Sequence, residues 1–360
     1  MTSIAIDARM IRSSGIGTII ANVTPRLIAR NPGWRFQLIG DPGMIGQFGW
    51  STAPNVEVVP FQAPIFTIAE QTRFPVARLA PSRVLWSPNY QTPLRWKGKL
   101  LVNVNDMGHL VLPEMRNSLA KQIYARTMFA RLRLRADAIA HISHFTADEF
   151  HRLIGRPRGR EEVIHCGVDE SWFSIAGATV RDRPYILFVG NVKPHKNIAR
   201  LLDAYDRIRV DIPHDLVIAG RKEGFITGDN TVLNRIAEFG GRVAFTGYIS
   251  DGEMKQLYAG AAALALPSLY EGFGLPPVEA MAAGVPALVS RAASLPEVCQ
   301  DAALYCDPLD VEDMAIQLRR ILTDQPLRQA LCAKGRMRAR QLNWDSCAQA
   351  YENTMNYLLG

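Results

Sequence analysis

Short apolar runs of strand length alternate with helical segments along the whole chain, and this alternation constrains the fold more than any other feature. Strands separated by helices pair in parallel, because each helix serves as the crossover between two strands. In the first half the expected strands are 4–8, 35–39, 56–59, 83–86, 100–104, 138–142 and 163–166. In the second half they are 185–189, 215–219, 243–246, 262–266, 287–289 and 303–305. The pattern predicts α/β domains with mainly parallel sheets.

The series of strands starts afresh near residue 183, and a chain of 360 residues suits two domains better than one core. Residues 169–182 are polar and have no clear periodicity, which is typical of a linker. We therefore expect an N-terminal domain over 1–168, a linker over 169–182 and a C-terminal domain over 183–344. A last helix is expected over 345–360, with its regular part at 345–358.

One stretch joins two carboxylates to a strand-to-helix turn, and it reads SLYEGFGLPPVEAMAAGVP from Ser268 to Pro286. A strand is expected before it, and a helix over 278–283 is closed by Gly284. Glycines in the turn let the backbone approach a ligand closely, and the first amides of a helix attract an anion. Glu271 and Glu279 then lie at different depths, where each can accept from hydroxyl groups. This predicts a site for a diphosphate that carries sugar hydroxyls.

This string resembles the signature of retaining glycosyltransferases of the GT-B fold, in glycosyltransferase family 4, and of its mannosyltransferase-like members in bacterial polysaccharide assembly. Further matching segments are YILFVG at 185–190 followed by Lys196-Asn197, FTGYIS at 245–250, SLPEV at 294–298 and Asn343-Trp344. The resemblance implies two Rossmann-like, doubly wound domains that face each other across a cleft. It also implies that the C-terminal helix crosses back to the first domain, which binds the acceptor, while the second binds a nucleotide sugar.

The resemblance assigns roles to residues of the second domain. It implies that Lys196, following Gly190, binds the donor's phosphates together with the amides of Phe273, Gly274 and Leu275. Glu271 would hold the donor sugar and Glu279 the ribose. Many members carry a further arginine beside this glycine or lysine, where this chain has Asn191 and His195.

Arg221 or Lys222 is the expected substitute for that missing cation, because both follow the strand that ends near Gly220. Tyr248 and Ile249 resemble the segment whose backbone contacts the nucleobase. Tyr248 would either stack on the base or pack in the core. Backbone contacts do not identify the base, so the base stays open.

In the first domain, the resemblance implies that Gly15 and Gly17 form a glycine loop facing the donor phosphate. The family commonly has His-Asp where this chain has Asn105-Asp106. Asparagine can hydrogen-bond a sugar hydroxyl but cannot accept a proton for catalysis. Asn105, Asp106 and His109 are therefore the candidates beside the donor sugar, with His109 either entering the site or remaining a loop histidine.

Composition sets limits on partners and location. The first 170 residues hold 21 Lys and Arg against 13 Asp and Glu, although the whole chain carries only +7. The densest basic part, 116–135, predicts an amphipathic helix that contacts an anionic membrane or simply exposes charge to water. No apolar run reaches the roughly 20 residues that span a bilayer, so we expect a cytoplasmic protein, peripheral on the inner face of the membrane at most. No nucleic-acid-binding module accompanies the charge.

The sequence thus predicts an enzyme that transfers a hexose from a nucleotide diphosphate sugar to a saccharide acceptor, with retention. GDP-mannose is the first choice of donor, and UDP-glucose, UDP-linked N-acetylhexosamines and dTDP- or GDP-deoxysugars remain open. A lipid-diphosphate-linked acceptor in exopolysaccharide or O-antigen assembly is expected. Neither a metal nor a cofactor is expected, because the chain has no Asp-x-Asp pair and no paired cysteine motif. The alternatives are a GT-B epimerase or phosphorylase, or a protein that binds nucleotide sugars without catalysis.

Overall fold

The computed structural model describes residues 2–65, 67–116, 119–175, 177–178, 181–220, 230–247 and 249–360, apart from the side chains of 230, 231 and 233. The chain divides into two compact units. Unit 1 consists of Met1–Cys166 and Trp344–Gly360, and unit 2 consists of Gly167–Asn343. The expected linker, residues 169–182, begins inside unit 2 with a short 3-10 helix at Glu170–Trp172, and the ring of Trp172 packs edge-on against Tyr258.

Unit 1 is built on a parallel sheet of seven strands, in the order β3-β2-β1-β4-β5-β6-β7. The strands are β1 (Thr2–Asp7), β2 (Trp34–Gly40), β3 (Val56–Pro60), β4 (Val84–Ser87), β5 (Lys99–Val104), β6 (Ala138–His141) and β7 (Arg160–Val163). The central strands are buried on both faces, as the continuous apolar runs predict. The order reverses between β1 and β4, so the crevice beyond their carboxyl ends is where a doubly wound sheet binds ligands.

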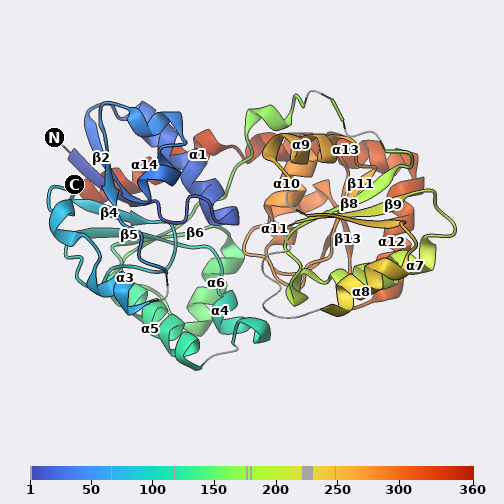
Figure 1. Ribbon diagram of the computed structural model, residues 1–360, viewed down its shortest axis with the longest axis horizontal. Coiled ribbons are helices and arrows are strands. Elements are labelled where there is room, and N and C mark those ends of the chain that lie inside the picture. The colour runs from blue at the N-terminus through green and yellow to red at the C-terminus, as the bar shows by residue number, and fades with distance from the viewer. Residues whose placement is uncertain are drawn as a thin grey trace. The chain divides into compact units, whose positions relative to one another are not determined.

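Helices cover both faces of this sheet (Figure 1). The helices of unit 1 are α1 (Ser14–Arg30), α2 (Pro42–Ile45), α3 (Ile68–Thr72), α4 (Gly108–Val111), α5 (Leu119–Arg135), α6 (His144–Leu153) and α14 (Trp344–Leu359). Phe129 and Leu132 of α5 pack against Leu85 and Val102 of the sheet in one buried cluster. The opposite face is covered by α1 and α14, which lie against each other.

The last helix belongs to unit 1 because its apolar residues recur at helical spacing and face the sheet. The buried positions of α14 are Trp344, Cys347, Ala348, Tyr351, Thr354, Met355 and Leu358. Tyr351 stacks obliquely on Trp86 of β4 at 4.8 Å, and its hydroxyl accepts a hydrogen bond of 2.6 Å from Nδ2 of Asn103. This helix therefore fixes the middle of the first sheet through one buried aromatic and polar contact.

Unit 2 repeats the architecture with a parallel sheet of six strands in the order β10-β9-β8-β11-β12-β13 (Figure 1). Its strands are β8 (Tyr185–Val189), β9 (Asp215–Ala219), β10 (Val243–Gly247), β11 (Ala263–Leu266), β12 (Ala287–Ser290) and β13 (Leu304–Cys306). Its helices are α7 (Ile198–Ile208), α8 (Asn230–Glu238), α9 (Asp251–Ala259), α10 (Leu275–Ala282), α11 (Leu295–Cys299), α12 (Val311–Thr323) and α13 (Gln325–Gln341). Here the order reverses between β8 and β11.

The α/β class and the doubly wound sheets are confirmed, and one expected strand is displaced. Residues 163–166 were expected to form the last strand of the first half, but β7 spans Arg160–Val163. The strand lies at the edge of its sheet, so it can carry the charged residues Arg160, Glu161 and Glu162. The apolar residues that follow, Ile164 and Cys166, are buried in the connection that leaves the sheet.

We predict that Tyr351→Ala lowers the free energy of unfolding by about 3–5 kcal/mol, because it opens a cavity beside Trp86 and leaves the Asn103 amide without its partner. Denaturant unfolding followed by circular dichroism measures the loss. The matched control is Asn356→Ala on the exposed face of the same helix, which should change stability by no more than about 0.5 kcal/mol. Equal effects of both variants would contradict this account of α14.

Candidate functional site

The site predicted in the second half lies at the carboxyl ends of β8 and β11, the two strands between which the sheet order of unit 2 reverses. The loop after β8 carries Lys196, in a 3-10 turn at Pro194–Lys196, and the loop after β11 carries Glu271. Because the two strands are neighbours, both side chains emerge at the same edge. The topology therefore brings together two residues that lie 75 positions apart in sequence.

Lys196 and Glu271 form a partly buried ion pair. Nζ of Lys196 lies 2.6 Å from Oε1 and 2.8 Å from Oε2 of Glu271, and the two side chains are 17% and 11% exposed. Ser268 donates a further hydrogen bond of 2.7 Å to Oε1. The carboxylate of Glu271 therefore accepts three hydrogen bonds, two from Lys196 and one from Ser268, and it holds the positive charge of Lys196 in a fixed position.

The loops that hold this pair are fastened to each other. The side-chain amide of Asn197 donates to the carbonyl oxygens of Pro267 at 3.0 Å and Pro308 at 2.7 Å. The backbone N–H of Leu269 donates to the carbonyl oxygen of His195 at 2.7 Å. Asn197 has a left-handed backbone with φ of 62°, a conformation that asparagine tolerates better than most residues. Asn197 was expected only as part of a matching segment, and its fastening role was not predicted.

The glycine turn before α10 is shaped by contacts that glycine alone permits. Gly274 has φ of 96°, and a Cβ atom there would lie 2.6 Å from Cδ2 of Leu295. Ser294 donates to the carbonyl oxygens of Glu271 at 3.0 Å and Phe273 at 2.9 Å. These bonds hold the turn in place and direct the chain into α10.

Two prolines limit which N–H groups are available at the start of α10. Pro276 and Pro277 occupy the first turn of the helix and have no N–H group. The N–H groups at the positive end of the helix therefore come from the residues before Pro276, among them Phe273, Gly274 and Leu275, as the sequence pattern suggested. These amides and Lys196 are suited to an anion at this edge, and their role in binding a diphosphate stays a prediction.

Glu279 lies one turn inside α10 and is partly buried. The hydroxyl of Tyr258, on α9, donates a hydrogen bond of 2.9 Å to its Oε2. Burial raises the pKa of Glu279 to about 7, although the Tyr258 hydrogen bond opposes this rise. Tyr258 itself is fully buried and packs against Trp172. The tyrosine partner was missed because nothing in the sequence links positions 21 residues apart on different helices.

Gly190 lies directly after β8, where its backbone approaches that of a neighbouring loop. A Cβ atom on Gly220 would lie 2.2 Å from the carbonyl oxygen of Gly190, so the two glycines allow close contact between the loops after β8 and β9. A Cβ on Gly190 would lie 3.9 Å from Cδ of Lys196. Gly190 therefore leaves space beside the lysine.

The remaining candidates of the second half are described only in part. Ile249 is half-buried between β10 and α9. Arg221, Lys222 and Tyr248 lie outside the described residues. Their expected roles as a second cation and a base-contacting ring stay predictions.

In unit 1, the predicted glycine loop is instead the first turn of a helix. α1 begins at Ser14, so Gly15 and Gly17 are helical. A Cβ on Gly17 would lie 2.5 Å from the carbonyl oxygen of Ile11, whereas one on Gly15 would meet no atom within 4 Å. The turn that contains Ile11 thus packs against α1 at Gly17, where only glycine leaves enough room. Gly15 faces open space. The two glycines were wrongly placed in a loop, because the first turn of α1 includes both of them, and their expected role of facing the donor phosphate stays a prediction.

The three polar candidates after β5 have local partners. Nδ2 of Asn105 donates to the carbonyl oxygen of Pro88 at 2.8 Å, and Oδ1 of Asp106 accepts from the backbone N–H of Gly108 at 2.7 Å. His109 lies on α4 with its ring edge-on to Tyr90 at 5.6 Å. Asp106 thus has a structural role at the start of α4. Oδ1 of Asn105 is buried without a hydrogen-bond partner among the described residues.

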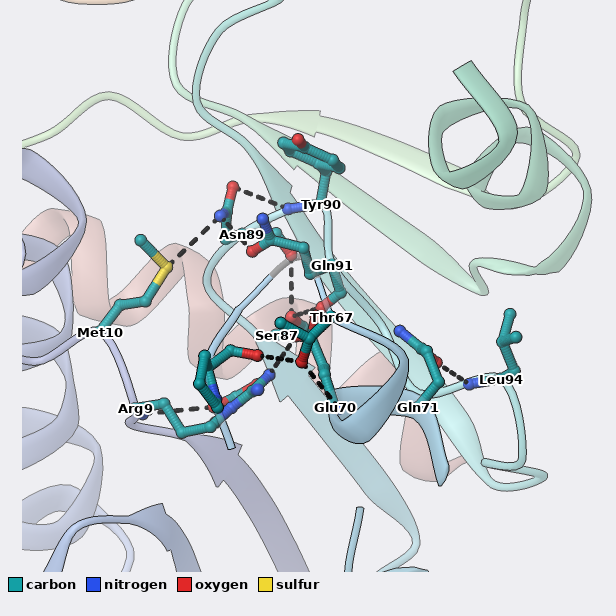
Figure 2. Close-up of polar contacts among 12 residues, drawn as sticks. Arg9, Met10, Thr67, Glu70, Gln71, Ser87, Asn89, Tyr90, Gln91 and Leu94 are labelled. Atoms are coloured by element: carbon teal, nitrogen blue, oxygen red, sulfur yellow. Dashed lines mark hydrogen bonds and ion pairs between the residues drawn. The ribbon is translucent and has the colours of Figure 1, made fainter. Parts of the chain in front are cut away.

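A buried polar cluster that sequence analysis missed lies beside these residues, at the carboxyl ends of β1 and β4. Arg9 forms ion pairs with Asp7 at 2.6 Å and with Glu70 at 2.8 Å, and its side chain is only 7% exposed. Figure 2 shows Arg9 next to Glu70, with Ser87 and Gln91 gathered nearby. The signal available in the sequence was the pair of opposite charges Asp7 and Arg9 at the end of the first strand.

Two hydrogen-bond donors of this cluster have no partner among the described residues, namely Nη1 of Arg9 and Nε2 of Gln91. Both residues line a small cavity together with Asp7, Met10, Ile16, Ser87, Pro88 and Asn89. Two carboxylates balance the single guanidinium, so the cavity carries no net positive charge from these groups. Buried donors without partners are costly unless a ligand or water satisfies them. The cavity has a volume of only about 10 Å³, so a single water molecule is the size of ligand that can satisfy these donors.

Within the basic segment 116–135, residues 119–135 form α5, and the cations of this helix divide into two sets. Arg131 donates to Oγ1 of Thr92 at 3.0 Å, and Arg135 donates to the carbonyl oxygen of Gly98 at 2.8 Å, so both bind the loop before β5. Lys121, Arg126 and Arg133 are exposed instead. They share the outer surface of α5 with the exposed apolar side chains of Leu119, Ile123 and Leu134.

Two Rossmann-like units, with a lysine, a carboxylate and a helix N-terminus at the switch point of the second, are typical of enzymes that bind nucleotide sugars. Residues 174–338 match the family model described as glycosyl transferases group 1. The chain is 29% identical to O-antigen chain mannosyltransferase B of Escherichia coli over 285 residues, which cover 75% of this chain and 73% of the relative. It is 36% identical to the MMP alpha-(1->4)-mannosyltransferase of Mycolicibacterium hassiacum over 192 residues, which cover 52% of this chain and 46% of that relative.

Solved structures agree on the fold. Sucrose-phosphate synthase from Thermosynechococcus elongatus superposes with a TM-score of 0.77 at 20% identity, covering 100% of this chain and 99% of the other. Anabaena Alr3699/HepE in complex with UDP and glucose gives a TM-score of 0.77 at 16% identity, covering 99% of this chain and 100% of the other. At these identities the likeness establishes the GT-B fold alone.

The chain is a glycosyltransferase with a group 1 domain over residues 174–338. Two relatives are named as O-antigen chain mannosyltransferases and another as a serotype-specific mannosyltransferase, which is consistent with the resemblance to mannosyltransferase-like members of glycosyltransferase family 4. Among the described residues, the helices are too short or too polar to cross a bilayer.

The raised pKa of Glu279 predicts how stability depends on pH. The folded pKa of about 7 lies above the unfolded value of 4.5, so the folded state holds this proton more tightly. We expect the wild type to lose about 1–3 kcal/mol of unfolding free energy relative to Glu279→Gln as the pH rises from about 4.5 to about 7. Denaturant unfolding of both proteins across this range measures the difference.

Tyr258→Phe provides the second arm of this experiment. It removes the hydrogen bond that lowers the pKa of Glu279, so the midpoint of the pH dependence should move upward. Identical pH profiles for wild type and Glu279→Gln would show that Glu279 does not retain its proton in the folded state.

Proposed function

We propose that this enzyme transfers a hexose, mannose from GDP-mannose in the first instance, to a saccharide acceptor with retention of anomeric configuration. The observation that carries the proposal is the Lys196–Glu271 pair at the switch point of unit 2, beside the N-terminus of α10. A cation and backbone amides at one edge suit a diphosphate, and a neighbouring carboxylate suits the hydroxyls of the attached sugar.

The positive groups at this edge can assist a reaction in which negative charge develops on a leaving diphosphate. When the bond between the anomeric carbon and the phosphate oxygen breaks, negative charge grows on the leaving diphosphate, where Lys196 and the amides of Gly274 and Leu275 would stabilise it. The acceptor hydroxyl bonds to the anomeric carbon on the same face, and its proton passes to an oxygen of the leaving phosphate. Atoms and charge then balance without a protein nucleophile, a metal ion or another cofactor.

The sugar and base of the donor are proposed from the relatives. O-antigen chain mannosyltransferase B and O-antigen chain mannosyltransferase RfbU of Salmonella typhimurium are both named for mannose transfer. We therefore place mannose first, with GDP as the base-bearing carrier. UDP-glucose and the other nucleotide sugars are separate arms of the donor experiment.

The acceptor is proposed to be a saccharide bound by unit 1. Oδ1 of Asn105, buried after β5 without a hydrogen-bond partner among the described residues, is an acceptor that a sugar hydroxyl can satisfy. We further propose that this saccharide is lipid-diphosphate-linked, as expected for O-antigen or exopolysaccharide assembly at the inner face of a membrane.

Kinetic measurements with GDP-mannose test the donor site. Lys196→Ala should lower kcat by roughly 10²-fold or more, since it removes one preorganised charge from the leaving group. Glu279→Ala should mainly raise the donor KM, since it removes the carboxylate proposed to hold the ribose. Lys334→Ala is the matched control, because this lysine pairs with Asp301 on the surface of the same unit.

Turnover of UDP-glucose but not GDP-mannose would contradict the proposed donor while keeping the site. Unchanged kinetics in both site variants, with an active wild type, would contradict the site itself. Release of free or epimerised sugar nucleotide without any acceptor would favour an epimerase.

Membrane contact through α5 is tested separately. Reversing the charges of Lys121, Arg126 and Arg133 to Glu should weaken co-sedimentation with vesicles containing anionic lipid by roughly 10²-fold or more, at about 1 kcal/mol for each basic residue. The wild type should lose the same binding in high salt. Three reversals on unit 2, at Arg319, Arg320 and Lys334, serve as the control. Equal loss in both triple variants would assign binding to net charge rather than to α5.

A further inference from the structure

Three side chains with metal-binding atoms converge on unit 1, apart from every residue assigned above to donor or acceptor. They are His141 at the end of β6, His151 in the last turn of α6 and Glu161 on β7. Two of these elements are neighbouring strands, and the third is the helix that connects them. The side chains thus come from three consecutive elements of the fold.

The two imidazoles meet the same carboxylate oxygen. Nε2 of His141 lies 3.1 Å and Nε2 of His151 lies 2.6 Å from Oε1 of Glu161. One donor atom from each of the three residues lies within 4.8 Å of the other two. Two nitrogens and one oxygen are the donor set that zinc takes in sites with three protein ligands and an open fourth position.

The separation of 3.1 Å between Nε2 of His141 and Oε1 of Glu161 is close to what a metal requires. Tetrahedral Zn²⁺ with bonds of about 2.0–2.1 Å places its ligand atoms roughly 3.3 Å apart. Only the contact between His151 and Glu161 is much shorter, and both side chains are about one-quarter exposed, at 23% and 25%. A small rotation of His151 therefore opens the space without disturbing the core.

His141 supplies the rigid side of the arrangement. Its side chain is fully buried, and its ring packs edge-on against Phe150 at 5.5 Å. The parallel register pairs Ile139 with Glu161 and His141 with Val163, so His141 and Glu161 project from the same face of adjacent strands. A fixed histidine and two partly exposed ligands leave the open position toward solvent.

We propose that His141, His151 and Glu161 bind one zinc ion, which fastens the edge strand β7 and helix α6 to β6. Each of these elements contributes one ligand, so the ion closes a link across the edge of the sheet. Its effect is on the stability of unit 1. This inference does not rest on the proposed transfer reaction, because none of the three residues contributes to the donor or acceptor groups.

Hydrogen bonds alone could hold the same trio, and one conservative substitution separates the two cases. In Glu161→Gln the amide oxygen still accepts hydrogen bonds from both imidazoles, but the charged ligand is gone. A site held by hydrogen bonds tolerates this change, whereas a zinc site loses an anionic ligand.

Calorimetric titration of the full chain tests the proposal, using protein without a polyhistidine tag that has been stripped with EDTA and dialysed. Zn²⁺ alone is the probe. The wild type should bind one ion per chain and unfold at a higher temperature when zinc is present. His151→Ala and Glu161→Gln should weaken binding at least about 100-fold, since even loss of an outer-shell partner costs about 10–100-fold.

Co²⁺ provides a spectroscopic readout that a structural effect would not produce, because a tetrahedral site gives visible absorption bands that the two variants should lack. His144→Ala and His165→Ala are the controls, since these two rings pair with each other elsewhere on unit 1 at 6.1 Å. Circular dichroism in EDTA shows whether each variant is folded. Failure of the wild type to bind zinc, or equal zinc affinity in wild type and the folded Glu161→Gln, would overturn the proposal.

Discussion

The ion pair between Lys196 and Glu271 joins the loops that follow β8 and β11, and the arrangement of the donor site depends on it. Without a ligand, each group neutralises the other in a partly buried position. In the proposed reaction a diphosphate would bring negative charge to the same edge, so Lys196 would exchange its carboxylate partner for phosphate oxygens. Glu271 would then be released to accept hydrogen bonds from sugar hydroxyls. Until the donor binds, the ammonium of Lys196 and the carboxylate of Glu271 stabilise each other's charge. Both groups are therefore already in place, which limits the structural reorganisation that donor binding requires.

The two glutamates of the motif differ because their surroundings differ. Glu271 lies on a loop and accepts from Lys196 and Ser268, whereas Glu279 lies in α10 with only the Tyr258 hydroxyl as a described hydrogen-bond donor. Burial therefore raises the pKa of Glu279 to about 7. Ribose hydroxyls would give this carboxylate the donors that it lacks. In the proposed function, Glu271 on the loop would exchange partners at the phosphate, whereas Glu279 in the helix would bind the neutral diol of the ribose.

The sequence predicted the features that local pattern determines. Apolar runs that alternate with helical segments predicted both sheets, because strands buried on both faces consist mainly of apolar residues. Apolar residues at helical spacing predicted α14, because only one face of that helix is buried. Partners that meet only in three dimensions were missed: Tyr258 beside Glu279, and Arg9 between Asp7 and Glu70. The edge strand β7 was displaced because an edge tolerates charge and so resembles a loop. Gly15 and Gly17 were assigned to a loop because glycine permits a close backbone approach both in loops and in the first turn of a helix, and the sequence does not distinguish the two cases.

The most direct test of the central claim is the affinity of Glu271→Gln and Lys196→Ala for GDP and for GDP-mannose, measured by calorimetry against the wild type. If Lys196 holds the diphosphate and Glu271 only neutralises it until the donor binds, Glu271→Gln should bind GDP at least as tightly as the wild type. It should also lose the additional affinity that the sugar provides, while Lys196→Ala should bind both ligands weakly. Loss of GDP affinity in Glu271→Gln as severe as in Lys196→Ala would contradict this division of roles.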